Sequence, residues 1–212
     1  MIVVSDEIWA DLIMPGYEHY MMGRLGGEIE ERLITCTAPS KTFNLAGLAT
    51  SSIIIKNKEL REKYSEMLQV MRSASVNILG FKACEIAYNQ AEKWLEELLV
   101  VLDTNQKAVK EFFEKKFPKI KVKLIEGTYL QWLDFRKLES DYVLQWLDFR
   151  ALGISDEELE RFMHMDAQFF TDEGYIFGEE GSGYERINLA APTWVIEREL
   201  ERLGKALEKI YK

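Results

Sequence analysis

Three short apolar runs in the first 57 residues alternate with polar segments and have the composition of β-strands. Each run is rich in β-branched residues and is bounded by polar ones: IVVSDEI (2–8), RLITCTA (32–38) and TSSIIIK (50–56). We expect all three to be buried strands. The first run stands at the start of the sequence and little helix separates the three, so we expect the remnant of a larger sheet in a truncated protein.

The hydrophobic period lengthens to that of a helix after residue 57. Asn57 is a helix cap for a segment over 57–73, and a longer helical region with one break runs over 80–117. Pro118 is expected to end that region. Apolar residues recur there at spacings of three and four, which predicts packing into a core: Leu95, Leu98, Leu99, Leu102, Val109, Phe112 and Phe113.

The rest of the chain contains segments with the hydrophobic period of a strand and segments with that of a helix. The pattern predicts strands over 121–127, 129–136 and 184–190, a short helix with a capping-box start over 155–163, and a terminal helix over 192–211. These elements indicate an α+β layer in which helices cover one face of a small sheet. With the strands of the first part, the chain as a whole is of the α/β class.

The seven residues LQWLDFR occur twice without change, at 130–136 and at 144–150. A repeat this short is not a solenoid, which needs at least about three units, so a recent tandem duplication or an engineered insertion explains it better. Both copies have the same alternation, and either one fits the native strand position. We hypothesise that the two copies compete for one position in the sheet.

Composition excludes several classes of protein. The 212 residues are 47% hydrophobic and 30% charged, which is typical of a globular protein, and no apolar run approaches the roughly 20 residues that span a bilayer. A net charge of −9 argues against a nucleic-acid partner. Cys36 and Cys84 are expected to be reduced, mostly buried thiols in a cytoplasmic protein without a signal peptide. Neither they nor His19 and His164, which are far apart in the sequence, suggest a metal site.

One lysine, Lys41, stands alone in the uncharged segment APSKTFNLAG (38–47), just after the second predicted strand. A lysine amine in a neutral pocket can form a Schiff base with the aldehyde of pyridoxal phosphate. That cofactor needs an acid beside its pyridine nitrogen. Asp6 stands at the C-terminal end of the first strand, where ligands bind in open α/β sheets. Taken alone, this pattern favours a solvated loop lysine over a catalytic one.

The segments VVSDEIWADLIMPGYEH and ITCTAPSKTFNLAGLATSSIII closely resemble the fold-type I pyridoxal-phosphate enzymes. Within them, the chain is similar to the cystathionine β-lyase-like (MalY/PatB) branch of the class I/II aminotransferases. The resemblance continues through IFGEEGSGYERINLAAP and the last helix. It implies the C-terminal portion of such an enzyme: an incomplete PLP-transferase large domain with the start of the linking helix over 1–104, and a small C-terminal α+β domain over 105–212.

The resemblance also implies the roles of five residues. Lys41 binds pyridoxal 5'-phosphate and then moves the proton of the substrate Cα, while Asp6 pairs with the pyridine nitrogen. Ser40 hydrogen-bonds the cofactor phosphate, and Arg186 grips the substrate α-carboxylate, for which a planar guanidinium fork is suited. Trp9 departs from the family, in which His or Tyr contacts the phenolic oxygen of the cofactor, because an indole N–H can donate but is bulkier.

The parent enzyme implied by the resemblance catalyses α,β-elimination on small amino-acid substrates, cysteine S-conjugates such as cystathionine, as a cytoplasmic homodimer without a membrane partner. Two alternatives stay open. One is transamination, which uses the same lysine, and the other is a non-catalytic fragment that associates with itself through an exposed sheet edge. The N-terminal half of the family has no counterpart here, so we expect weak cofactor binding or none by this chain alone.

Overall fold

The computed structural model describes residues 1–73, 75–136 and 155–209, and it divides the chain into two compact units, Met1–Leu99 and Val100–Lys212. The division falls within one long helix, α4 (Glu92–Lys116), and the boundary predicted between residues 104 and 105 lies in the same helix. No helix in the described ranges is both long enough and apolar enough to span a membrane.

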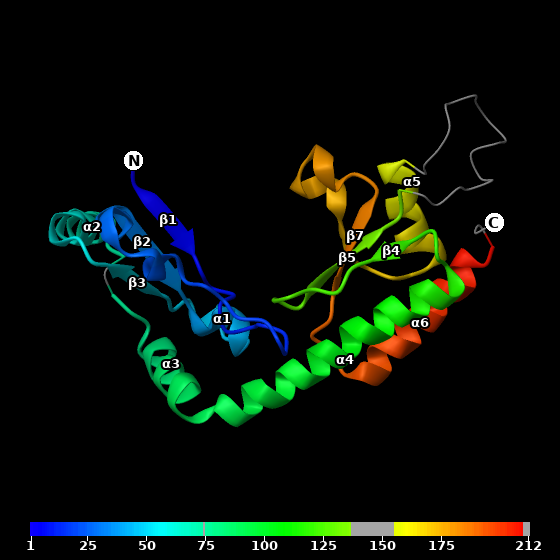
Figure 1. The fold of residues 1–212 in the computed structure, drawn as a ribbon, viewed down its shortest axis with the longest axis horizontal. Coiled ribbons are helices and arrows are strands. Elements are labelled where there is room, and N and C mark those ends of the chain that lie inside the picture. Colours follow the sequence, from blue (N-terminus) through cyan, green and yellow to red (C-terminus); the bar gives the residue numbers. More distant parts are fainter. Residues whose placement is uncertain (74, 137–154, 210–212) are drawn as a thin grey trace. The chain divides into compact units, whose positions relative to one another are not determined.

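The first unit contains a three-stranded sheet in the order β1-β2-β3 (Figure 1). Its strands are β1 (Val3–Asp6), β2 (Leu33–Thr37) and β3 (Ser52–Ile55), so all three predicted strands are confirmed. β1 runs parallel to β2, with Asp6 opposite Cys36, whereas β3 is antiparallel to β2. The carboxyl ends of β1 and β2 therefore meet at one edge of the sheet.

The expectation that these strands are buried is wrong for the two outer ones. Val4 on β1 is 63% exposed and Ile54 on β3 is 54% exposed. β1 and β3 are the edge strands of this sheet, so each has a hydrogen-bonded neighbour on one side only. Only β2 is paired on both sides, and Leu33 and Thr35 on it are buried.

Two helices of the first unit begin at asparagine caps. In α2 (Lys58–Val70) the side chain of Asn57 accepts a hydrogen bond from the Leu60 amide, which confirms the predicted cap. Asn77 caps α3 (Ile78–Gln90) in the same way. A short helix, α1 (Pro39–Thr42), follows β2 and carries Lys41. Three 3₁₀ turns complete the unit: Met22–Leu25, Gly27–Arg32 and Ala46–Leu48.

The second unit is built on an antiparallel sheet in the order β4-β5-β7-β6. Its strands are β4 (Lys121–Val122), β5 (Leu130–Asp134), β6 (Asp172–Glu173) and β7 (Tyr184–Asn188). Buried and accessible side chains alternate along β5 and β7, as expected for a sheet with one covered face. The buried positions are Gln131, Leu133, Glu185 and Ile187. The predicted α+β layer is thereby confirmed.

Helices α4 and α6 (Thr193–Leu207) lie side by side in this unit (Figure 1). Helix α5 (Asp156–Arg161) begins with the predicted capping box at Ser155 and continues into a π-helical turn, Phe162–Asp166. Short 3₁₀ turns at Gly174–Phe177 and Glu179–Gly181 lead into β7.

Part of the predicted apolar stripe lies at the centre of the second core. Leu102, Val109 and Phe113 on α4 are completely buried. The other residues of the stripe are half-buried: Leu95, Leu98, Leu99 and Phe112. The Phe113 ring meets the ring of Phe135, which follows β5, edge to face with centroids 6.4 Å apart. Helix α4 ends at Lys116, ahead of Pro118, and the predicted break in the helical region lies at Ala91. The periodicity thus predicted the helix, but three of the seven residues of the stripe are buried and four are half-buried.

Strand β4 is shorter than the predicted strand over 121–127, because buried side chains take over the hydrogen bonds of its second half. The Ile125 amide donates to the side-chain oxygen of Gln106 at 2.7 Å, and the side chain of Gln131 donates to the Lys123 carbonyl at 3.0 Å. The periodicity indicated neither β6 nor the π-helical turn. The first copy of LQWLDFR forms β5, while the second copy and the hypothesis of competing copies lie outside the described residues.

Candidate active site

Two of the predicted site residues stand at the same edge of the first sheet. β1 ends at Asp6 and its parallel neighbour β2 ends at Thr37. Helix α1 begins after a single linking residue, Ala38, so Lys41 follows the carboxyl end of β2 closely. Ligands of α/β sheets bind outside the carboxyl ends of parallel strands. The topology therefore positions an acid and an amine where such a ligand would bind.

The Lys41 side chain is half-buried against an aromatic ring. Its Nζ lies 5.5 Å from the centroid of the Trp9 ring, and in the described part of the chain no carboxylate forms an ion pair with it. The amine therefore contacts an aromatic ring and no carboxylate of the described residues. A lysine amine at such a place can form a Schiff base with an aldehyde.

Asp6 provides a negative charge at the same edge. One oxygen of its exposed carboxylate accepts the Ile8 amide at 3.2 Å, and no cation pairs with it within the described ranges. Cys36 lies opposite Asp6 on the neighbouring strand. Burial raises the pKa of the Cys36 thiol, and the charge of the Asp6 carboxylate raises it further. Cys36 and Cys84 are free, as predicted, but both are half-buried rather than mostly buried.

Helix α1 is fixed by a carboxylate that the sequence reasoning missed. Thr42, which follows Lys41 and is 1% exposed, donates its hydroxyl to Asp11 at 2.9 Å. The Tyr88 hydroxyl on α3 donates to the same Asp11 oxygen at 3.1 Å, and both burial and the Asp11 charge raise the pKa of Tyr88. Phe43 stacks edge to face on Tyr88, with centroids 5.4 Å apart. Asp11 thus joins the loop after β1, the lysine helix and α3.

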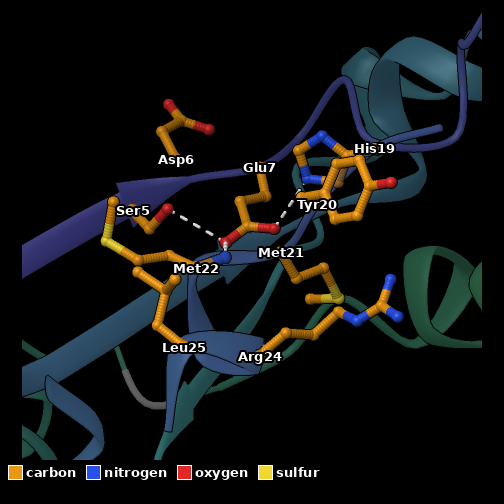
Figure 2. A pocket seen from close by; sticks show the side chains of 9 residues that line it. All are labelled: Ser5, Asp6, Glu7, His19, Tyr20, Met21, Met22, Arg24 and Leu25. Atoms are coloured by element: carbon orange, nitrogen blue, oxygen red, sulfur yellow. Dashed lines mark hydrogen bonds and ion pairs between the residues drawn. The ribbon is translucent and has the colours of Figure 1, made fainter. Parts of the chain in front are cut away.

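A buried acid, Glu7, fixes the backbone next to Asp6. Its side chain accepts hydrogen bonds from the Ser5 hydroxyl at 2.9 Å and from the Met22 amide at 3.1 Å, and it lies 2.8 Å from His19 Nε2. Figure 2 shows Asp6 pointing away from this cluster while Glu7 points into it. Burial disfavours the charged carboxylate, but these contacts outweigh burial and the pKa of Glu7 lies below its ordinary value of 4.5.

The cluster around Glu7 lines a cavity of about 450 Å³ between the end of β1 and the 3₁₀ turn Met22–Leu25 (Figure 2). Nothing in the residue spacing pairs Glu7 with His19 or Asp11 with Thr42, since twelve and thirty-one residues separate the partners. The sequence did carry one sign of the Glu7 cluster, since Glu7 lies inside an otherwise apolar run. A carboxylate that is buried in such a run needs a hydrogen-bonding partner.

The donor set of the first unit fits pyridoxal phosphate. The cofactor requires an amine for its aldehyde, an acid for its ring nitrogen and donors for its phosphate. The amine of Lys41 and the carboxylate of Asp6 have no ionic partners among the described residues, and Trp9 provides a ring beside the amine. Ser40 precedes Lys41 in α1 and is half-buried, so its hydroxyl is the nearest donor in the sequence for a phosphate oxygen.

Arg186 belongs to the second unit, on the accessible face of β7. Its Nε and one terminal nitrogen both donate to the same oxygen of Asp172, at 3.1 and 2.7 Å, and its guanidinium lies 4.3 Å from the centroid of the Phe177 ring. The side chain is therefore held in a fixed orientation by a carboxylate of its own chain. A substrate carboxylate at Arg186 would have to share the guanidinium with Asp172 or displace it.

Curated proteins from several organisms match almost all of the chain. It is 34% identical over 205 residues to cystathionine β-lyase PatB of Bacillus subtilis, across 97% of this chain and 49% of the relative. It is 27% identical over 209 residues to protein MalY of Escherichia coli, across 98% of this chain and 49% of the relative. The chain thus spans about half the length of the curated relatives it matches. No protein-family model matches it.

Solved structures give the same picture of the fold. Cystalysin from Treponema denticola, which contains a pyridoxal 5'-phosphate cofactor, superimposes with a TM-score of 0.88 and 48% identity over 99% of this chain and 50% of its own. The PLP-bound C-S lyase from Staphylococcus hominis has a TM-score of 0.81 and 29% identity over 98% of this chain and 49% of its own. The predicted fold class, part of a PLP-transferase fold, is confirmed.

Proposed function

We propose that this chain, a relative of the pyridoxal-phosphate-dependent cystathionine β-lyases and aminotransferases in sequence and fold, forms part of a PLP-dependent C–S β-lyase. The observation that carries the proposal is the pair formed by the Lys41 amine and the Asp6 carboxylate at one sheet edge, neither of which has an ionic partner among the described residues. The substrates proposed are cysteine S-conjugates such as cystathionine.

Four residues of the first unit would hold the cofactor. Lys41 would bind its aldehyde, Asp6 would keep its ring nitrogen protonated, Ser40 would donate to its phosphate and the Trp9 indole N–H would donate to its phenolic oxygen. When bound, pyridoxal phosphate supplies an electron sink for the electron pair left on the substrate Cα. The Asp6 carboxylate is suited to keeping the ring nitrogen protonated, because the Ile8 amide fixes one of its oxygens and leaves the other accessible.

The remaining steps rest on groups of this chain. Once the substrate amine has released it, the Lys41 amine would accept the Cα proton. The electron pair left on Cα would form a Cα=Cβ bond as the Cβ–S bond breaks with its own pair on sulfur, and the leaving thiolate would take up a proton to become a thiol. Water then converts the remaining three-carbon fragment into pyruvate and ammonia. Arg186 would orient the substrate by pairing with its α-carboxylate. This pairing requires that at least one of the two hydrogen bonds from Arg186 to Asp172 breaks.

Absorption spectroscopy tests the cofactor part of the proposal. The purified chain is mixed with pyridoxal phosphate, and its visible spectrum is compared with those of Lys41→Ala and of Lys58→Ala, an exposed lysine on α2 as a matched control. A visible band in the wild type and in Lys58→Ala that is absent from Lys41→Ala supports the assignment, whereas no band in any of the three proteins would mean that this chain alone does not hold the cofactor. The same band in all three proteins would mean that the aldehyde reacts with surface lysines, and the site assignment would be wrong.

Transamination is the second candidate, because the relatives also include an aspartate aminotransferase from Pyrococcus abyssi that is 27% identical over 217 residues. Both reactions begin with the same proton transfer to Lys41, so the site residues do not separate them. Release of pyruvate from a cysteine S-conjugate without an added keto acid supports elimination. A strict requirement for a keto acid acceptor supports transamination instead.

Self-association is the partner interaction that we propose for the chain. Val4 on the edge strand β1 is 63% exposed, and Ile2 just before it is 57% exposed. An edge strand with exposed apolar side chains readily pairs with another chain. Size-exclusion chromatography tests the proposal: Val4→Lys should shift a wild-type homo-oligomer toward the monomer, and an unchanged elution volume would exclude this edge as the interface.

A further inference from the structure

Three potential metal ligands meet in the second unit, outside the residues assigned to cofactor and substrate. Glu160 lies on α5, His164 on the π-helical turn that follows it, and Glu173 on β6. One ligand atom from each lies within 4.8 Å of the others. His164 Nε2 is 3.1 Å from a Glu173 oxygen, and Nδ1 is 4.0 Å from a Glu160 oxygen. Each residue is half-buried, so the group is accessible to an ion.

The local structure holds these side chains in place from several sides. Glu160 and His164 are four residues apart, which brings them to the same face of the helical segment. The Phe170 ring stacks on the His164 imidazole with centroids 4.9 Å apart. The Tyr175 hydroxyl donates to the second Glu160 oxygen at 2.7 Å, which leaves the first oxygen directed at the histidine. Such outer contacts orient the ligands in metal sites.

The carboxylates of Glu160 and Glu173 give the group a negative charge that favours a bound cation. Within the described residues, neither Glu160 nor Glu173 forms an ion pair with a lysine or arginine, so two carboxylates share a single histidine. A third acid, Glu185, is buried beside Glu173 on β7. Among the described residues, the cluster thus presents two carboxylates without a lysine or arginine counter-ion.

We propose that Glu160, His164 and Glu173 bind one divalent transition-metal ion, with Zn²⁺ as the expected species. One imidazole nitrogen and two carboxylate oxygens are three of the four ligands of a tetrahedral Zn²⁺ site, and water would be the fourth. Mg²⁺ and Ca²⁺ prefer oxygen ligands alone, so the histidine favours zinc. The three atoms lie within 4.8 Å of one another, and a Zn²⁺ ion bound by them would lie about 2.0–2.2 Å from each.

The ion would connect α5 to β6. Strand β6 also carries Asp172, the carboxylate that holds Arg186, directly before the ligand Glu173. An ion bound by Glu173 would therefore fix the strand that orients the predicted substrate arginine. This coupling would be structural, since the ion has no part in the proposed elimination, and the metal site stands whether or not the proposed lyase activity does.

Calorimetric titration with Zn²⁺ alone tests the proposal on the full chain. The wild type is compared with His164→Gln and Glu173→Gln, and with Glu157→Gln as a matched control, because Glu157 is an exposed acid on the same helix as Glu160. We expect one bound Zn²⁺ in the wild type and in Glu157→Gln, and at least a tenfold weaker association in the two ligand variants. Unchanged far-UV circular dichroism would establish that all four proteins are folded.

Cobalt substitution separates this site from the two free thiols. Co²⁺ bound through nitrogen and oxygen gives weak visible bands, whereas thiolate ligation by Cys36 or Cys84 adds an intense near-ultraviolet band. Weak visible bands that disappear in His164→Gln support the assignment. Equal Zn²⁺ affinity in all four proteins, no Zn²⁺ binding by the wild type, or a thiolate band that survives in His164→Gln would overturn it.

Discussion

The hydroxyl of Thr42 donates to the carboxylate of Asp11 at 2.9 Å, and this bond ties the residue after Lys41 to the loop that follows Asp6. The two partners are thirty-one residues apart in the chain. The bond therefore sets how the helix that carries the amine stands relative to the strand that carries the acid. In the proposed enzyme, these two groups have to meet opposite ends of one pyridine ring.

Asp11→Ala should destabilise the first unit. The substitution leaves the buried Thr42 hydroxyl without its acceptor and removes the partner of Tyr88, which together should cost about 1–3 kcal/mol. Asp11→Asn keeps an acceptor oxygen of the same shape and should lose less. Urea unfolding of the two variants, followed by tryptophan fluorescence, measures the difference. Equal losses in both variants would show that the hydrogen bond to Thr42 contributes little.

The Glu7 cluster predicts a pH dependence of stability. Because the pKa of Glu7 lies below its ordinary value of 4.5, the folded state favours the charged carboxylate more than the unfolded state does. The stabilisation is present above pH 4.5 and is lost as the pH falls through the folded pKa. The difference in unfolding free energy between wild type and Glu7→Gln should therefore be largest near neutral pH and should shrink below about pH 4.5. A difference that grows on acidification would contradict this reading.

A glycine at the start of α3 has no room for a side chain. A Cβ on Gly80 would lie 1.9 Å from the Thr50 hydroxyl oxygen and 2.8 Å from the Leu48 carbonyl oxygen. The carbonyl belongs to the backbone and cannot turn away, so Gly80→Ala should cost about 1–3 kcal/mol through overpacking. Gly47→Ala is the control, because a Cβ there meets nothing within 4 Å. Thermal unfolding should show a lower midpoint for Gly80→Ala alone.

The core of the second unit depends on Phe113. Its ring is completely buried and contacts the rings of Phe112, Phe117 and Phe135. Phe113→Ala should lower the unfolding free energy of this unit by about 3–5 kcal/mol, since it leaves a cavity among aromatic side chains. Phe81→Ala, at a position that is 62% exposed, should change stability by less than about 0.5 kcal/mol. Similar losses for the two variants would mean that this aromatic cluster is not the centre of the core.

Local patterns in the sequence predicted most of the elements. The β-branched runs, the Asn57 cap, the capping box at Ser155 and the apolar stripe of α4 each act through neighbours a few residues away. The strand-end acid and the isolated lysine were also visible, because both depend on their position relative to predicted strands. Their chemical roles came from the resemblance to a family, since the residue pattern itself favoured a solvated lysine.

The tertiary structure decided which distant side chains meet. Exposure of Val4 and Ile54 follows from the strand order, and the pairing of Arg186 with Asp172 follows from the register of β6 on β7. The partners of Asp11, the cluster around Glu7 and the Glu160–His164–Glu173 group likewise depend on contacts between separate elements. Periodicity reports which face of an element is apolar, whereas hydrogen bonds and shared ligands depend on how folded elements approach one another, which no local spacing encodes.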